Sequence, residues 1–147
     1  MNLKKSLETH LTSALDGSGL AFDWEGLILD LRDSPEVVQP RLRLVLQKNM
    51  GKGPSGKATS LRFSLSFNIF VRDRGYAGRL AEIRDLIAAA FPPGGWVSFK
   101  DFSADPVEEL DKISIRSITV DQPLPTKEGY LQHNLTVGGE LVQDWAG

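Results

Sequence analysis

The chain has 147 residues, of which 41% are apolar and 24% charged, and its formal net charge at pH 7 is -2. This ordinary globular composition excludes a disordered, a collagen-like and a membrane-spanning chain. The chain contains no cysteine, which excludes a disulfide framework, a thiolate zinc site and a cysteine nucleophile. Since this length is enough to bury a core, we expect residues 1–147 to form a single domain.

The N-terminal segment predicts an amphipathic helix over residues 2–15. Its apolar side chains recur at every fourth position, at Leu3, Leu7, Leu11 and Leu15. Glu8 and His10 interrupt the stretch where a signal peptide needs an apolar run, so we expect no secretion signal. No apolar run is long enough to cross a bilayer, and we expect no membrane partner. Residues 27–31 predict a short buried strand or an extended segment.

The centre of the chain predicts a long β-hairpin. Its first strand covers residues 41–47, with three leucines on one face (Leu42, Leu44 and Leu46). Its second strand covers residues 60–72 and alternates with period two. The apolar face of this strand carries Leu61, Phe63, Leu65, Phe67, Ile69 and Val71. Residues 49–59, rich in Gly, Pro, Ser and Lys, predict a flexible hairpin loop. A strand this long exceeds the common length, so part of the hairpin should project beyond the domain body.

The second half of the chain predicts a helix over residues 76–91, which Pro92 and Pro93 end. A short strand around Trp96 follows, and then an acidic connection over residues 101–111 with one helical turn after Pro106. The last strand covers residues 130–142. We therefore expect an α+β fold with a mainly antiparallel sheet and a long β-hairpin, flanked by the N-terminal helix and the central amphipathic helix.

The strand near residue 115 changes the phase of its alternation. Ile113 and Ile115 share one face, whereas Ile118 and Val120 share the other. Such a change predicts a β-bulge near residues 116–117.

Catalytic motifs give no positive prediction. Residues 51–57 match the GxxxxGK part of a phosphate-binding loop, but Ala58 stands where Ser or Thr would bind magnesium, and a strand follows instead of a helix. His10 and His133 are the only histidines, and neither has a metal-ligand spacing. We expect no catalytic residue, no metal, no cofactor and no enzymatic activity.

The charges are polarised along the chain. Between residues 37 and 72 there are seven basic residues and no acidic one: Arg41, Arg43, Lys48, Lys52, Lys57, Arg62 and Arg72. From Asp101 onward there are nine acidic residues against three basic ones. Such asymmetry is typical of a protein with a polyanionic partner, or of a subunit that meets its neighbour head to tail.

Acidic and aromatic residues complete the candidate interface. Glu108, Glu109 and Asp111 could form a carboxylate pair or a site for a hard metal ion, but a solvated acidic loop is the commoner arrangement. Phe70 is the one apolar residue on the polar face of its strand. We predict that the seven basic residues, these three acids and Phe70 contact another subunit or the tube on which it assembles.

The order of predicted elements is similar to that of the tail terminator (tail completion) proteins of long-tailed bacteriophages. The resemblance lies in chain length and in the succession of N-terminal helix, long hairpin with a basic loop, strand and helix over residues 62–91, acidic connection and two final strands. It includes the closing segment Tyr-Leu-Gln-His-Asn-Leu-Thr-Val over residues 130–137. No single motif is diagnostic of this family, whose members share shape more than residues.

The resemblance implies a virion structural protein of the tail or neck, assembled in the host bacterial cytoplasm. It implies a ring of identical subunits, expected to be a hexamer, that stops polymerisation of the tail tube protein and presents a surface to the head–tail connector. Two alternatives stay open: another neck or baseplate ring component, and a module that binds nucleic acid through the basic hairpin. We expect no sequence-specific recognition of nucleic acid, since the hairpin loop lacks aromatic residues.

Overall fold

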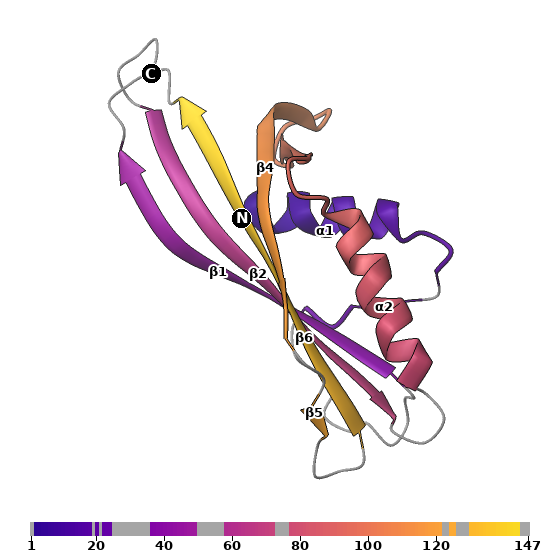
Figure 1. The fold of residues 1–147 in the computed structure, drawn as a ribbon. Helices are drawn as coiled ribbons and strands as arrows, with labels where there is room; N and C mark the ends of the chain where they lie inside the picture. Colours follow the sequence, from indigo (N-terminus) through magenta and orange to yellow (C-terminus); the bar gives the residue numbers. More distant parts are fainter. Residues whose placement is uncertain are drawn as a thin grey trace.

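The computed structural model describes residues 2–18, 20, 22–24, 36–49, 58–72, 77–121, 124–125 and 130–144 (Figure 1). These residues form a mixed α+β fold. In chain order, the elements are α1 (Asn2–Ala14), β1 (Glu36–Asn49), β2 (Ala58–Arg72), α2 (Ala77–Ala90), β3 (Trp96–Asp101), β4 (Glu108–Val120), β5 (Leu124–Pro125) and β6 (Tyr130–Asp144). Both predicted helices are confirmed. The strand expected at 27–31 lies outside the described residues, as do residues 50–57 of the expected loop. Asn49, Ala58 and Thr59 are strand residues.

The strands of the described residues form one antiparallel sheet in the order β1-β2-β6-β4-β3, with the short β5 beside β6. β2 pairs with β1 on one side and β6 on the other. Five of its apolar side chains are at most 2% exposed: Phe63, Leu65, Phe67, Ile69 and Val71. The sixth, Leu61, is half-buried. The predicted alternation over residues 60–72 is therefore confirmed.

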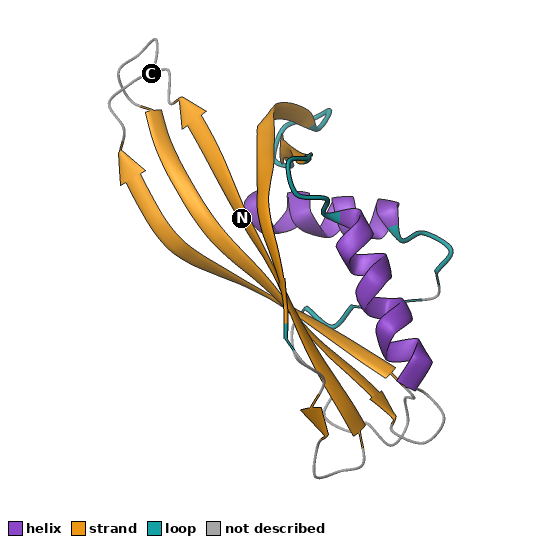
Figure 2. Ribbon diagram, viewed as in Figure 1, coloured by secondary structure: helices purple, strands orange, loops and turns teal. Residues whose placement is uncertain are grey.

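Both helices cover the same face of the sheet (Figure 2). Leu7 and Leu11 of α1 and Ile83 and Ile87 of α2 are buried in one core with the apolar face of β2. Their spacing of four residues places each pair on one helical face. Helix α2 stops before two prolines, because a proline has no N–H to donate to the preceding turn.

A bulge interrupts β4 between Ile115 and Ser117, where the sequence predicted it. Beyond the bulge, Ile118 pairs with the buried Val137. Since directly opposed residues of antiparallel strands point to the same side, Ile118 returns to the core face, against which it packs. The change of phase seen in the sequence is therefore explained by the predicted bulge, because the extra residue brings the later apolar side chain back to the core face.

A second bulge, which we did not predict, lies in β1 between Leu44 and Leu46. Leu44 pairs with Phe63 on the core face, whereas Leu46 pairs with Arg62 on the other face. The prediction that the three leucines of this strand share a face was therefore wrong beyond Leu44. The inserted residue, Val45, is 62% exposed.

The predicted acidic connection over residues 101–111 is shorter in the structure, because β4 begins at Glu108. The register pairs Glu109 with Lys100 and Asp111 with Phe99. The helical turn expected after Pro106 was wrong, since the chain enters a strand two residues later. Antiparallel pairing with β3 supplies the backbone hydrogen bonds that a helical turn would have made.

The ends of β1, β2 and β6 nearest to residues 50–57 extend beyond both helices (Figure 1). This arrangement agrees with the expectation that part of the hairpin projects from the domain. No helix in the described ranges has the length and apolar character needed to cross a membrane.

Candidate subunit interface

β1 and β4, which carry described basic and acidic candidates respectively, lie toward opposite edges of the sheet (Figure 1). Arg41 and Arg43 are exposed on β1, the first strand of the sheet order. Glu108 and Glu109 are exposed at the start of β4, where it pairs with β3, the last strand of that order. The polarity seen along the sequence is therefore also a polarity across the sheet.

Three of these charges have no partner within the described part of the chain. The side chains of Arg41, Arg43 and Glu108 make no hydrogen bond or ion pair there. The other two acids are engaged: the Ser98 hydroxyl donates to Glu109 over 3.1 Å, and the backbone N–H of Lys112 donates to Asp111 over 2.8 Å. Free charges at the two edges are available to a partner without first breaking an internal contact.

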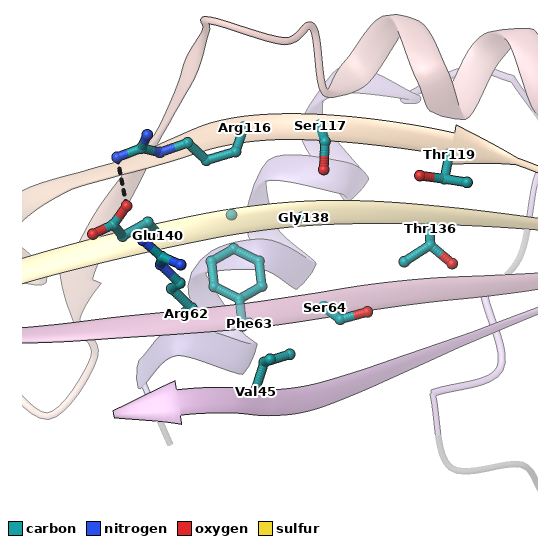
Figure 3. Close-up of a pocket in the computed structure, with 11 residues that line it drawn as sticks. Val45, Arg62, Phe63, Ser64, Arg116, Ser117, Thr119, Thr136, Gly138 and Glu140 are labelled. Atoms are coloured by element: carbon teal, nitrogen blue, oxygen red, sulfur yellow. Dashed lines mark hydrogen bonds and ion pairs between the residues drawn. The ribbon is translucent and has the colours of Figure 1, made fainter. Parts of the chain in front are cut away.

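Arg62, in contrast, has an acidic neighbour within the chain. It lies directly opposite Glu140 in the register of β2 and β6. The Ser60 hydroxyl donates to Glu140 over 2.7 Å, and the guanidinium of Arg116 donates to its other oxygen (Figure 3). The Ser60 hydrogen bond, followed by the charges of Arg116 and Arg62, lowers the pKa of Glu140 against the opposing effect of burial.

The remaining candidates are placed less completely. Lys48 lies in β1 and Arg72 ends β2, and only the backbone of these two residues is described. Lys52 and Lys57 lie outside the described residues. Phe70 is half-buried on the outer face of β2, opposite the buried Val37 of β1. Its position agrees with packing against the sheet as well as with a contact to a partner.

A shallow hollow of about 460 Å³ lies on the outer face of β2, β6 and β4 (Figure 3). Hydroxyl groups line it, from Ser64, Ser117, Thr119 and Thr136. Gly138 leaves the floor open, because a Cβ there would lie 2.6 Å from the Ser117 hydroxyl oxygen. Only the glycine pair and the predicted β4 bulge could have indicated this hollow, and they form it only once β4 and β6 pair.

The charged side chains that line the hollow are Arg62, Arg116 and Glu140. Neither histidine lines it. His133 is 2% exposed and its Nε2 contacts the backbone oxygen of Asp121, while the His10 ring contacts the backbone oxygen of Ala90 over 2.6 Å. Within the described ranges, no three His, Asp or Glu side chains cluster in a way that could hold a metal ion.

The two sheet edges differ in how their backbone groups are satisfied. Helix α1 covers the β3 edge: the Ser6 hydroxyl accepts a hydrogen bond from the N–H of Lys100 over 3.0 Å, and Asn2 accepts one from Phe102 over 3.3 Å. On β1, the oxygen of Val38 accepts from the N–H of Asp23. From Arg41 onward, no described segment pairs with the outer edge of β1. Such an edge is a template for another strand.

Exposed apolar side chains occur at both edges, and sequence reasoning did not select them. Leu44 and Val45 are 46% and 62% exposed on β1. Trp96 and Leu110, on the hairpin of β3 and β4, are 53% and 42% exposed. Alternation over residues 96–99 places Trp96 and the core residue Val97 on different faces of the strand. This was a usable signal that Trp96 is exposed. Leu44 is paired with Phe63 on the core face, and Val45 and Leu110 are the residues left unpaired at the bulges of the two ladders.

Comparisons with known proteins identify the fold and no family. No family model matches the sequence, and no curated protein matches it significantly. Twelve solved chains match. One of them is 14% identical with a TM-score of 0.69, and the match covers 97% of this chain and 94% of that one. That protein bears only a sequence designation, which states neither an activity nor a partner. At this identity, the similarity shows the fold alone.

Proposed function

We propose that this protein is a non-enzymatic virion component of the tail terminator type. In this proposal, identical subunits close into a ring, expected to be a hexamer, on the last layer of a bacteriophage tail tube. The ring stops addition of further tube subunits and presents its other side to the head–tail connector. The protein acts through surfaces alone and needs neither metal nor cofactor.

The observation that carries the proposal is the separation of unpaired opposite charges across the sheet. Arg41 and Arg43 lie at one edge, and Glu108 lies toward the other. A closed ring joins two different patches of each subunit, so each subunit must present a donor patch and an acceptor patch. Patches of opposite sign on opposite edges meet that requirement and disfavour contact between two like patches.

The projecting ends of β1, β2 and β6 support a role in which one part of the subunit reaches another protein layer (Figure 1). The helices do not cover the core-facing side of these strand ends. Leu44, on that side of β1, is 46% exposed. We assign these ends to the contact with the tail tube or the connector. The hydroxyl-lined hollow has no histidine to activate its serines, which favours a structural role over hydrolysis.

Assembly of tail tubes with and without this protein tests the proposal. Tube protein alone should form tubes of unlimited length, and adding this chain should shorten the length distribution measured by negative-stain electron microscopy. The shortened tubes should carry a ring at one end. Tube lengths that do not change at any ratio of the two proteins would contradict the proposal.

A nucleic-acid-binding module remains the second candidate, since two arginines whose side chains have no partner among the described residues are exposed on β1 of the hairpin. Such a module would bind DNA with an affinity that falls linearly with salt on logarithmic axes. Fluorescence anisotropy with a labelled duplex at several salt concentrations separates the two candidates. A terminator forms a discrete oligomer. Its effect on tube length does not depend on salt-sensitive DNA binding. Another neck or baseplate ring would form the oligomer but leave tube length unchanged.

A further inference from the structure

We infer that the face of the sheet opposite the helices binds single-stranded nucleic acid without sequence preference. This surface, called here the outer face, runs from β1 to β3 across the hydroxyl-lined hollow. The inference goes beyond the proposed ring and does not rest on it, because it concerns the broad side of the sheet instead of its two edges. The occupant has a defined chemistry, that of a flexible chain of phosphates that also carries planar bases.

The strand register shows which charged side chains share the outer face. Directly opposed residues of antiparallel strands point to the same side, and Arg62 and Ser64 of β2 alternate with the buried Phe63. The described basic side chains on the outer face are Arg41, Arg43, Arg62, Lys100, Lys112 and Arg116. The described acidic ones are Glu109, Asp121 and Glu140. Positive charges therefore outnumber negative ones on this face, which attracts a polyanion.

The arginines of the outer face differ from the basic residues of the helices in their partners. Three basic side chains of the helices form ion pairs: Lys4, Arg79 and Arg84. Arg41, Arg43 and Arg62 form no ion pair or hydrogen bond with a described side chain. Arg116 donates to Glu140 and is still 64% exposed. Because a guanidinium has five N–H donors, all four arginines are able to contact an external phosphate without losing an internal partner.

The hollow on β2, β6 and β4 supplies further donors for phosphate oxygens (Figure 3). Arg62 and Arg116 line it together with four hydroxyl groups, and Arg43 lies opposite the lining residue Ser64. Guanidinium and hydroxyl groups are among the side chains that contact the phosphates and sugars of nucleic acids. Gly138 has no side chain to obstruct a strand that lies across β6. The hollow is therefore a path for the backbone of a nucleic acid.

Trp96 adds an aromatic surface to the same face. It lies opposite Ser114 of β4, which in turn lies opposite Glu140 of β6. Neighbouring strands lie about 4.8 Å apart, so the backbone of Trp96 is about 10 Å from that of Glu140, which lines the hollow. The indole is 53% exposed, and the Lys112 ammonium lies 4.3 Å from the centre of its ring. Exposed aromatic rings beside positive charge are the surfaces on which the bases of a single strand stack.

The ionic part of the contact is tested with two double variants of equal charge. Fluorescence anisotropy measures binding of a labelled oligothymidylate of about 20 nucleotides, longer than the site of one small domain. Arg62→Gln/Arg116→Gln should weaken binding at low salt by at least about tenfold and reduce the slope of log affinity against log salt by about 1.4, since each phosphate contact on a single strand contributes about 0.7. Lys5→Gln/Arg84→Gln, on the helices, is the matched control and should change neither value. Equal effects of the two double variants would overturn the inference.

Trp96→Ala separates stacking from charge. It should weaken binding of the oligothymidylate by about fivefold or more, as for loss of one stacked base, and leave the salt slope unchanged. Trp96→Phe should keep most of the affinity, because it retains an aromatic ring. Polyglutamate of equal charge should compete poorly. Full affinity of Trp96→Ala, or competition by polyglutamate as strong as that by unlabelled oligothymidylate, would overturn the inference, since the outer face would then bind acidic chains in general.

The same proteins keep this inference distinguishable from the proposed function. Arg62→Gln/Arg116→Gln leaves the edge charges Arg43 and Glu108 in place and should still limit tube length. Circular dichroism checks that each variant folds. A wild-type chain that limits tube length but does not bind the oligothymidylate overturns this inference alone. A wild-type chain that binds the oligothymidylate but leaves tube length unchanged supports this inference and overturns the proposed function.

Discussion

Gly139 and Phe63 lie opposite each other in β6 and β2, and the Phe63 ring occupies the space that a side chain on Gly139 would fill. A Cβ placed on Gly139 would lie 2.3 Å from the tip of the ring, closer than any real contact between two carbons. This packing lets the sheet bury the Phe63 ring, which is 2% exposed, against the backbone of β6. The glycine is therefore required by its neighbour and not by an unusual backbone angle.

Gly139→Ala should destabilise the fold by about 1–3 kcal/mol, the usual cost of overpacking a core. Urea unfolding monitored by circular dichroism gives the change in free energy. Gly78→Ala is the matched control: no atom lies within 4 Å of its missing Cβ, and in helix α2 it should stabilise the protein by up to about 1 kcal/mol. Combining Gly139→Ala with Phe63→Leu should restore part of the loss. Equal effects of the two alanine substitutions would refute this account of Gly139.

Arg79 joins helix α2 to the first residue of β1. Its guanidinium makes two hydrogen bonds to the Glu36 carboxylate, over 2.7 and 3.0 Å, and these raise the pKa of Arg79. Both side chains are about three-quarters buried. Arg79→Lys should cost about 1 kcal/mol in the free energy of unfolding, because a lysine cannot make the paired contact. Arg84→Lys, at an exposed pair with Asp85, should have no measurable effect. The prediction fails if the two lysine variants unfold at the same urea concentration.

The Ser60–Glu140 hydrogen bond should make stability depend on pH in the acid range. The pKa of Glu140 is lower in the folded chain than in the unfolded chain. Its contribution is therefore fully present above the ordinary carboxyl pKa and is lost as the pH falls through the lower, folded value. Ser60→Ala should reduce stability by about 1 kcal/mol near pH 7 and by less at pH 3. Urea unfolding of both proteins across this range provides the measurement, and a difference independent of pH would count against the assignment.

The unpaired charges at the two edges predict a charge-reversal pattern. Arg43→Glu and Glu108→Arg should each weaken ring formation, because each creates a like-charge contact with the unchanged edge of the neighbour. Both reversals in one chain restore opposite signs and should restore the oligomer mass measured by light scattering in low salt. Arg62→Glu is less informative, since Arg62 lies opposite Glu140 in the same chain. If the double variant does not recover the oligomer mass, the two edges do not meet.

Much of the fold could be predicted from the sequence, because the spacing of apolar residues and the residues that end helices and strands are local signals. The alternation over residues 60–72 and the repeat of leucines in α1 each reflect one buried face, and the prolines after Phe91 reflect the missing N–H of proline. The β1 bulge could not be predicted, because Leu42, Leu44 and Leu46 keep an unbroken alternation across it. Only pairing with β2 identifies Val45 as the inserted residue.

The candidate interface was predicted in its charge and not in its apolar part. The excess of basic residues before residue 72 and of acids after residue 101 is visible in the sequence, and sheet order separates the two sets in space. The pairing of Arg62 with Glu140 required the register of β2 and β6, because 78 positions separate them in the chain. Trp96 was read as a strand residue, although its alternation with the core residue Val97 indicated that it faces outward.

The central claim is that copies joined edge to edge form a ring that ends a tail tube. The most direct measurement is the length distribution of tubes assembled with the wild-type chain, with Arg43→Glu, and with the Arg43→Glu/Glu108→Arg double variant, by negative-stain electron microscopy. The account predicts short capped tubes with the wild type, long uncapped tubes with the single variant, and short capped tubes again with the double variant. Tubes of the same length in all three samples and in the absence of the protein would contradict it.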